Sequence, residues 1–244
     1  MTSTRKKALI LGGDRSYYKP FSFMYDFSFD LTDMYRHVDE YGLVVFTGGE
    51  DVTPHLYGDY SADNITHYSY GRDKWEQSAF NFALKNKVPM AGICRGMQFL
   101  NVMDGGRLLH DITGHAKSRG QHMMYTYRGV ISVNSLHHQA CIPSPRGLTI
   151  GWTKSDDLNV LGNYDVQLKR WPNIITEAMI FPSINAYGVQ YHPEMMDNKE
   201  KAVQWFSELV SDFATFNSIE DIVNKWSYKR IYITDKKMTA NQTQ

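Results

Sequence analysis

Apolar residues along the chain occur either in short unbroken runs or at helical spacing. Residues 8–11 and 43–46 are unbroken apolar runs followed by glycines, a pattern typical of parallel strands buried on both faces. Residues 73–86 and 199–213 instead place apolar side chains along one face, which predicts amphipathic helices. Strands that alternate with helices in this way predict an α/β fold with a mainly parallel central sheet flanked by helices.

The middle of the chain follows a different pattern. Four segments there predict strands, the first two with the weak alternation of antiparallel pairs: 125–133, 148–161, 177–181 and 186–191. Residues 17–30 are aromatic but have no clean period, so we expect a loop packed over the core. These segments predict an antiparallel β insertion in the sheet. Since no linker is evident, we expect one domain over residues 1–244, with 218–244 as a C-terminal extension whose order the sequence leaves open.

Composition narrows the classes of function. The chain has 26 Lys and Arg against 26 Asp and Glu, so its formal net charge is zero, and nothing indicates a nucleic-acid or membrane surface. The two cysteines are too few for a secreted disulfide scaffold, and the apolar run at 8–11 is too short for a signal peptide. We therefore expect a cytoplasmic protein whose partner is a small molecule.

A candidate nucleophile follows the apolar run 88–91. The sequence there is Gly92-Ile93-Cys94-Arg95-Gly96, a nucleophile elbow with cysteine where many hydrolases carry serine. Only glycine fits on either side when a strand turns abruptly into a helix, and the N-terminus of that helix favours the thiolate form of the sulfur. A buried structural cysteine is the alternative reading of this motif on its own.

A candidate base follows the predicted strand 186–191. His192 and Glu194 flank Pro193 there, and residues i and i+2 of an extended chain point to one side. The carboxyl ends of parallel strands face one crevice, so His192 is expected to meet Cys94. Glu194 would accept the Nδ1 proton of His192 and leave Nε2 facing the sulfur. A structural histidine at a strand end is the alternative for an isolated residue.

Four blocks in this order carry a resemblance to a known family. They are Phe46-Thr47-Gly48-Gly49-Glu50-Asp51-Val52-Thr53-Pro54-His55-Leu56-Tyr57-Gly58, Gly92-Ile93-Cys94-Arg95-Gly96-Met97-Gln98, Val133-Asn134-Ser135-Leu136-His137-His138-Gln139 and Gly188-Val189-Gln190-Tyr191-His192-Pro193-Glu194. The chain resembles the class I glutamine amidotransferase superfamily, most closely its γ-glutamyl-γ-aminobutyrate hydrolase-like (γ-glutamyl hydrolase) branch. The resemblance implies a flavodoxin-like fold and a Cys-His-Glu triad, which falls on Cys94, His192 and Glu194.

The resemblance also implies further site residues. An oxyanion hole would use backbone N–H groups of the Gly48–Gly49 loop, here Gly49, and of Arg95, which follows the nucleophile. Gln98 is expected to contact the glutamyl group, together with Gly48. In the block 133–139, Ser135 and His137 are expected to line the same pocket, although a polar turn between strands explains each of them almost as well. No metal and no cofactor are implied, since the spacing of the other histidines does not suit zinc.

The expected reaction is hydrolysis of a γ-glutamyl amide through a γ-glutamyl thioester, with release of glutamate. Two alternatives stay open: a glutaminase subunit that supplies ammonia to a separate synthetase, and a catalytically silent binding protein of the same fold. The leaving amine is not fixed by the sequence. The loops 14–40, 55–71 and 115–128 are expected to shape its side of the cleft, and a homodimer is a family-level expectation.

Overall fold

The computed structural model describes residues 5–59, 66–113, 120–154, 159–161 and 174–227. Its main sheet has the strand order β2-β1-β3-β4-β13-β12-β10-β7-β8. The parallel part consists of β2 (Asp26–Ser28), β1 (Lys7–Leu11), β3 (Tyr41–Phe46), β4 (Met90–Ile93) and β13 (Ala186–Val189). The antiparallel part consists of β12 (Ile174–Phe181), β10 (Leu148–Lys154), β7 (Gln121–Thr126) and β8 (Gly129–Asn134).

Two smaller pairings complete the β structure. β9 (Ala140–Ile142) joins the main sheet through β12 and pairs with β5 (Arg107–Leu109). β6 (Asp111–Thr113) and β11 (Asn159–Leu161) form a separate ribbon. The mixed, mainly parallel central sheet predicted from the sequence is confirmed. The antiparallel strands come from residues between the third helix and β13, and they continue the same sheet.

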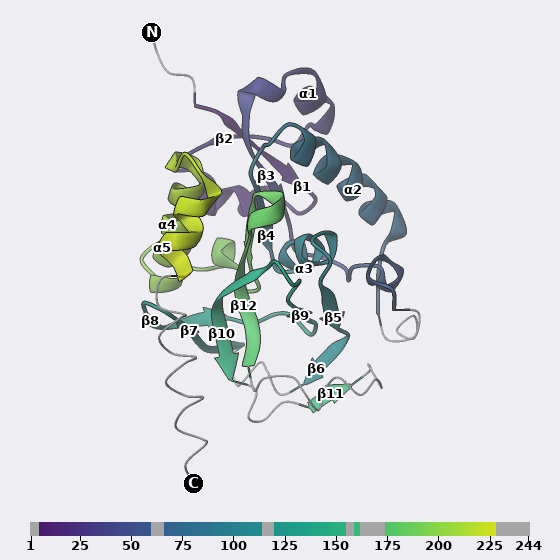
Figure 1. Ribbon diagram of the computed structural model, residues 1–244, viewed down its shortest axis with the longest axis vertical. Coiled ribbons are helices and arrows are strands. Elements are labelled where there is room, and N and C mark those ends of the chain that lie inside the picture. Colours follow the sequence, from purple (N-terminus) through teal and green to yellow (C-terminus); the bar gives the residue numbers. More distant parts are fainter. Residues whose placement is uncertain (1–4, 60–65, 114–119, 155–158, 162–173, 228–244) are drawn as a thin grey trace.

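Helices cover both faces of the sheet (Figure 1). On one face lie α4 (Lys201–Thr215) and α5 (Ile219–Ser227), and on the other lie α1 (Leu31–Arg36), α2 (Tyr70–Lys85) and α3 (Arg95–Met103). Successive strand residues point to opposite faces, so Ile10 packs in the cluster of α4 and α5 whereas Leu9 and Leu11 pack with α1, α2 and α3. Both faces of β1 and β3 are therefore buried, which explains their unbroken apolar runs.

The prediction of a loop over residues 17–30 is wrong in part. A 3₁₀-helix spans Arg15–Phe21, and β2 pairs in parallel with the edge of β1. β2 has three residues with largely exposed side chains, so it lacks the apolar run that marks a buried strand. The 3₁₀-helix buries Tyr17 and Phe21 but is too short to show a period.

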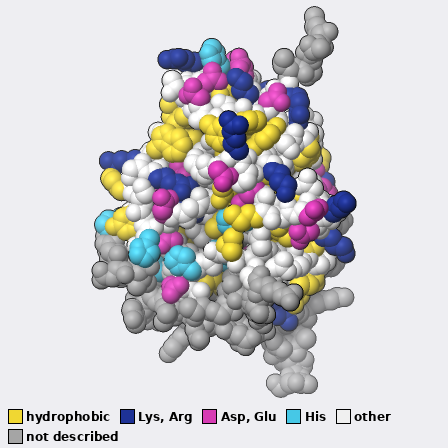
Figure 2. Space-filling model, turned by 180° about the vertical axis from the view of Figure 1, so that it is seen from behind, with side chains coloured by type: hydrophobic (Ala, Val, Ile, Leu, Met, Phe, Trp, Pro, Cys, Tyr) yellow, Lys and Arg dark blue, Asp and Glu magenta, His cyan; other side chains and the backbone are white. Residues whose placement is uncertain are grey.

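The structure describes the first part of the predicted C-terminal extension. α5 packs Ile222 and Trp226 into the same cluster as α4, while residues 228–244 lie outside the described part of the chain. Acidic and basic side chains are interspersed on the face drawn in Figure 2, in keeping with the zero net charge. Within the described residues, no helix is both long and apolar enough to cross a membrane.

The parallel strands bring three chemically important segments to one edge. β3 runs into Thr47, β4 into Cys94, and β13 into Gln190. Because these strands are parallel neighbours in the order β3-β4-β13, their carboxyl ends lie side by side. Parallel sheets characteristically place their ligand sites at this edge.

Candidate active site

Cys94 occupies a strained turn between β4 and α3. Its backbone has φ 54° and ψ −112°, a left-handed region that residues with a side chain rarely adopt. A Cβ added to Gly96 would overlap the carbonyl of Phe46, and one added to Gly92 would lie 2.5 Å from the backbone of Gly96. The amide of Cys94 donates to Val189 O at 2.8 Å, which ties the turn to β13. The glycines predicted at this elbow are thus required by close backbone contacts.

His192 and Glu194 meet just after β13. The Nδ1 atom of His192 lies 2.6 Å from Glu194 Oε1, and both side chains are almost fully buried. The two residues come together through a 3₁₀-turn that begins at Pro193, rather than through the extended chain assumed from the sequence. Asn134 fixes the backbone of His192 on the other side, since its amide donates to His192 O at 2.9 Å and accepts from His192 N at 2.7 Å.

The imidazole of His192 lies between two acidic groups. Burial alone would lower its pKa, but hydrogen bonds to Cys94 and Glu194, together with their charges, outweigh burial and raise the pKa of His192 to about 10. Cys94 therefore lies close enough to His192 to act on the pKa of its imidazole. The raised pKa keeps the imidazole of His192 protonated at neutral pH, beside Cys94 and Glu194.

Tyr17 is a neighbour of this group that the sequence did not indicate. Its ring centroid lies 6.3 Å from that of His192, and the phenol is buried. Burial first, and then the charges of Glu194 and Cys94, raise the pKa of Tyr17, so the phenol stays neutral and able to donate a proton in a hydrogen bond. The loop 14–40 was expected to shape the cleft, but its aperiodic aromatic sequence did not indicate which ring enters the site.

The pKa of His192 leads to a prediction for Glu194→Gln. This change removes a charge and a strong hydrogen-bond acceptor that raise the pKa of His192, so the pKa falls. A protonated His192 is needed to donate a proton, and its fraction declines as pH rises through the pKa. The alkaline limb of a pH–activity profile should therefore move to lower pH in Glu194→Gln. The exposed Glu220→Gln on α5 is the matched control and should leave the profile unchanged; an unshifted limb in Glu194→Gln would contradict the assignment.

The Gly48–Gly49 loop lies directly against this group. A Cβ on Gly48 would come within 2.5 Å of Tyr17 Oη and 2.9 Å of His192 Cε1, so only glycine allows this approach. Gly49 has φ 141°, which also favours glycine. Arg95 begins α3 immediately after Cys94, and its side chain turns away into buried ion pairs with Asp73 and Glu76. The Gly48–Gly49 loop thus lies against His192, and the backbone of Arg95 immediately follows Cys94.

The other predicted contact residues are buried, and Gln98 and His137 share the backbone carbonyl of Gln139 as a partner. Gln98 is buried one turn into α3, and its Nε2 approaches Gln139 O at 3.4 Å and Gln190 Oε1 at 3.3 Å. The Oγ of Ser135 and the side-chain amide of Gln139 are buried without a hydrogen-bond partner among the described residues. His137 bonds Gln139 O through Nδ1 at 2.8 Å, so one ring nitrogen is used internally. Buried unpaired polar atoms are costly, which indicates that water or a ligand satisfies them.

The remaining candidates for metal or thiol chemistry have local roles. Cys141 is buried on β9, and burial raises the pKa of its thiol well above the usual value, so it is inert. His110 lies 3.2 Å from Asp59, and His122 lies 3.2 Å from Glu177. His115 lies outside the described residues. In the part of the chain that the structure describes, no group of three or more His, Cys, Asp or Glu side chains could hold a metal ion.

Comparison with known proteins agrees with the fold. The solved structure of a glutamine amidotransferase from Thermotoga maritima superposes with a TM-score of 0.52 at 15% identity, over 91% of this chain and 85% of that one, which places the fold among class I glutamine amidotransferases. The family model for peptidase C26 matches residues 26–194. The chain therefore belongs to the peptidase C26 family, whose members are hydrolases of the glutamine amidotransferase type.

Two relatives bear on the activity. A protein of Mycobacterium tuberculosis, provisionally named a glutamine amidotransferase, is 31% identical over 176 residues, or 64% of this chain and 52% of that protein. This chain therefore spans about half the length of that relative. The γ-glutamyl-CDP-amidate hydrolase of Campylobacter jejuni is 24% identical over 195 residues, which are 77% of this chain and 78% of that enzyme.

Proposed function

We propose that the protein hydrolyses the γ-glutamyl amide bond of a small γ-glutamyl amine or γ-glutamylated biosynthetic intermediate. The observation that carries the proposal is that Cys94, at the strained turn after β4, lies beside the hydrogen-bonded pair of His192 and Glu194. A thiolate beside a protonated imidazole is a nucleophile that already has its proton donor in place. The family supports hydrolysis, and the site supports cysteine as the attacking group.

The reaction would proceed in two halves. The Cys94 thiolate attacks the γ-carbonyl carbon, and His192 gives its proton to the nitrogen as the C–N bond breaks, so the free amine leaves and a γ-glutamyl thioester remains. Water then attacks the thioester as His192 takes its proton, the C–S bond breaks, and glutamate leaves while the Cys94 thiolate and the protonated His192 are restored. Glu194 would hold Nδ1 of the imidazole and stabilise its positive charge. Neither half requires a metal or a cofactor.

Backbone and buried polar groups would supply the rest of the site. The N–H groups of Gly49 and Arg95 would bind the developing oxyanion; loss of one such donor typically costs about 3–4 kcal/mol. Gln98, with the unpaired side chains of Ser135 and Gln139, supports recognition of the polar glutamyl head group, in which His137 would also take part. The phenol of Tyr17 lies on the His192 side of the cleft and would face the leaving amine.

A panel of amides tests the proposal. Glutamate release by the purified chain is measured for γ-glutamyl amides of small amines, γ-glutamyl amidates of nucleotides and glutamine, with the matching α-glutamyl amides as controls. The nucleotide amidates are included because the relative from Campylobacter jejuni is named for such a substrate. We expect turnover of at least one substituted γ-glutamyl amide and none of its α-isomer.

The same panel separates the alternatives. A glutaminase subunit of a synthetase would turn over glutamine alone, and weakly without its partner; this result would contradict the proposal. A silent binding protein would release no glutamate from any amide, and Cys94 would not be labelled by an electrophilic glutamine analogue. The unpaired side-chain amide of Gln139, whose backbone carbonyl Gln98 approaches, favours a bound γ-glutamyl group in either enzymatic case.

A further inference from the structure

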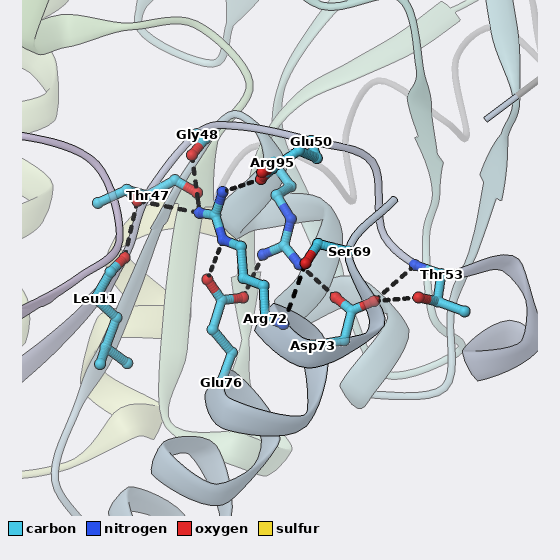
Figure 3. A network of polar contacts seen from close by, with 10 residues as sticks. All are labelled: Leu11, Thr47, Gly48, Glu50, Thr53, Ser69, Arg72, Asp73, Glu76 and Arg95. Atoms are coloured by element: carbon cyan, nitrogen blue, oxygen red, sulfur yellow. Dashed lines mark hydrogen bonds and ion pairs between the residues drawn. The ribbon is translucent and has the colours of Figure 1, made fainter. Parts of the chain in front are cut away.

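A largely buried network of charged side chains connects α2 to the Gly48–Gly49 loop and to Arg95 (Figure 3). Arg72 lies near the start of α2, and its guanidinium is largely buried. It bonds Glu76 through Nε at 2.9 Å and Glu50 through Nη1 at 2.7 Å. Its Nη2 donates to Gly48 O at 2.8 Å, and to Thr47 O and Thr47 Oγ1 at 3.2 Å each. One side chain thus fixes the loop after β3 at several points.

The bond to Gly48 O sets the orientation of one peptide group. In a trans peptide the C=O and the following N–H point in opposite directions. Because Arg72 holds Gly48 O toward α2, the N–H of Gly49 points away from α2. On that other side of the loop lie Tyr17 and His192, which a Cβ on Gly48 would strike. The bond from Arg72 therefore aims the Gly49 N–H at the cleft.

The second flanking segment is held by the same helix. The guanidinium of Arg95 forms buried ion pairs with Asp73 and Glu76 of α2, and Figure 3 shows Glu76 between Arg72 and Arg95. Asp73 also accepts from Thr53 N at 3.0 Å, beyond the Gly48–Gly49 loop. The N–H of Arg95 starts α3 beside Cys94. Glu76 therefore links the side chain that orients Gly49 to the residue that follows the nucleophile.

We infer that Arg72 is a positioning residue that presets the oxyanion hole by locking the Gly48–Gly49 peptide with its N–H toward the cleft, and that Glu76 couples this lock to Arg95. The inference rests on the proposed function, because it concerns the same acyl transfer to Cys94. The planar fork of Arg72 bonds acceptors on four residues at once, which a single lysine ammonium cannot reproduce. The oxyanion hole is therefore held in place by side chains of this same chain.

Kinetics of Arg72→Met and Arg72→Lys test the inference. Loss of one oxyanion donor typically lowers kcat about 10²- to 10³-fold, and we expect a fall of this order in Arg72→Met with KM changed by no more than a few fold. Arg72→Lys keeps the buried charge and so retains the ion pair to Glu76. Its kcat should nevertheless lie closer to that of Arg72→Met than to that of the unaltered protein. Lys74→Met removes an exposed cation from the same helix and should change nothing.

A second readout separates positioning from a merely structural role. Alkylation of Cys94 by iodoacetamide needs the thiolate but no oxyanion hole, so its rate should stay within a few fold in both variants. Acylation of Cys94 by p-nitrophenyl acetate, measured as a burst of p-nitrophenol, needs both the thiolate and the oxyanion hole. Its rate should therefore fall together with kcat. Equal falls in alkylation and acylation, or an unchanged kcat, would overturn the inference. If no γ-glutamyl amide is turned over, the proposed function fails, while the acetate burst still supports or overturns the role of Arg72.

Discussion

Replacing Cys94 with alanine is expected to abolish glutamate release from γ-glutamyl amides. Removal of the nucleophile of a comparable serine hydrolase lowers kcat on the order of 10⁶-fold, and we expect a loss of at least about 10⁴-fold here. The reason is that the attacking group is lost, and His192, whose Nδ1 is engaged by Glu194, is left without a nucleophile to serve. The measurement is initial-rate glutamate release from whichever amide the panel identifies.

Cys141→Ala is the matched control for this variant. Cys141 is the second cysteine of the chain, is buried on β9, and has a thiol whose pKa burial raises. Its replacement should leave kcat within a few fold. Iodoacetamide should modify the unaltered protein and Cys141→Ala to the same extent, at Cys94, and should not modify Cys94→Ala. Glutamate release by Cys94→Ala at the unaltered rate would refute a cysteine nucleophile.

Arg95→Met is expected to cause the largest loss of stability. The guanidinium is 1% exposed and pairs with the equally buried carboxylates of Asp73 and Glu76. Methionine fills much of the volume but leaves Asp73 without a cation and Glu76 with Arg72 alone. Removing one partner of a buried ion pair typically costs about 3–5 kcal/mol, since the remaining charge is uncompensated. Urea unfolding followed by circular dichroism should show a free energy of unfolding lowered by about this amount.

Arg146→Met is the control for the change of residue type. The side chain of Arg146 is 66% exposed and lies 3.6 Å from Asp104, so its pair is screened by solvent and should contribute no more than about 1 kcal/mol. A loss in Arg95→Met no larger than that in Arg146→Met would mean that Thr53 and Arg72 satisfy the two carboxylates without Arg95. The network of Figure 3 would then not be a unit.

The parts of the protein that were predictable from the sequence are those in which burial or close packing restricts the residue types over several neighbouring positions. β1 and β3 are buried on both faces, and the resulting apolar runs identify them. The glycines around Cys94 are needed because β3 and α3 approach the turn closely, and these glycines form a recognisable sequence motif. His192 and Glu194 are close in the chain, so their contact was predictable, although the 3₁₀-turn at Pro193 was not.

The parts that were not predictable depend on the direction in which a polar side chain points. Arg72 and Glu76 are four residues apart, which on a helix is the spacing of an ordinary solvent-exposed ion pair. Only the fold reveals that their side of α2 faces the Gly48–Gly49 loop. Ser135 was predicted to line the site, whereas its neighbour Asn134 is the residue that bonds His192, because the register of β8 decides which of the two reaches it. Tyr17 enters the site from a segment without a period.

The central claim is that one γ-glutamyl thioester on Cys94 is common to all substrates. Hydrolysis in the presence of hydroxylamine tests it, because hydroxylamine competes with water for the thioester and yields γ-glutamyl hydroxamate. For a series of amides with different leaving amines, we predict one constant ratio of hydroxamate to glutamate at a fixed hydroxylamine concentration. A ratio that changes with the leaving amine, or release of the amine with no hydroxamate, would contradict the claim.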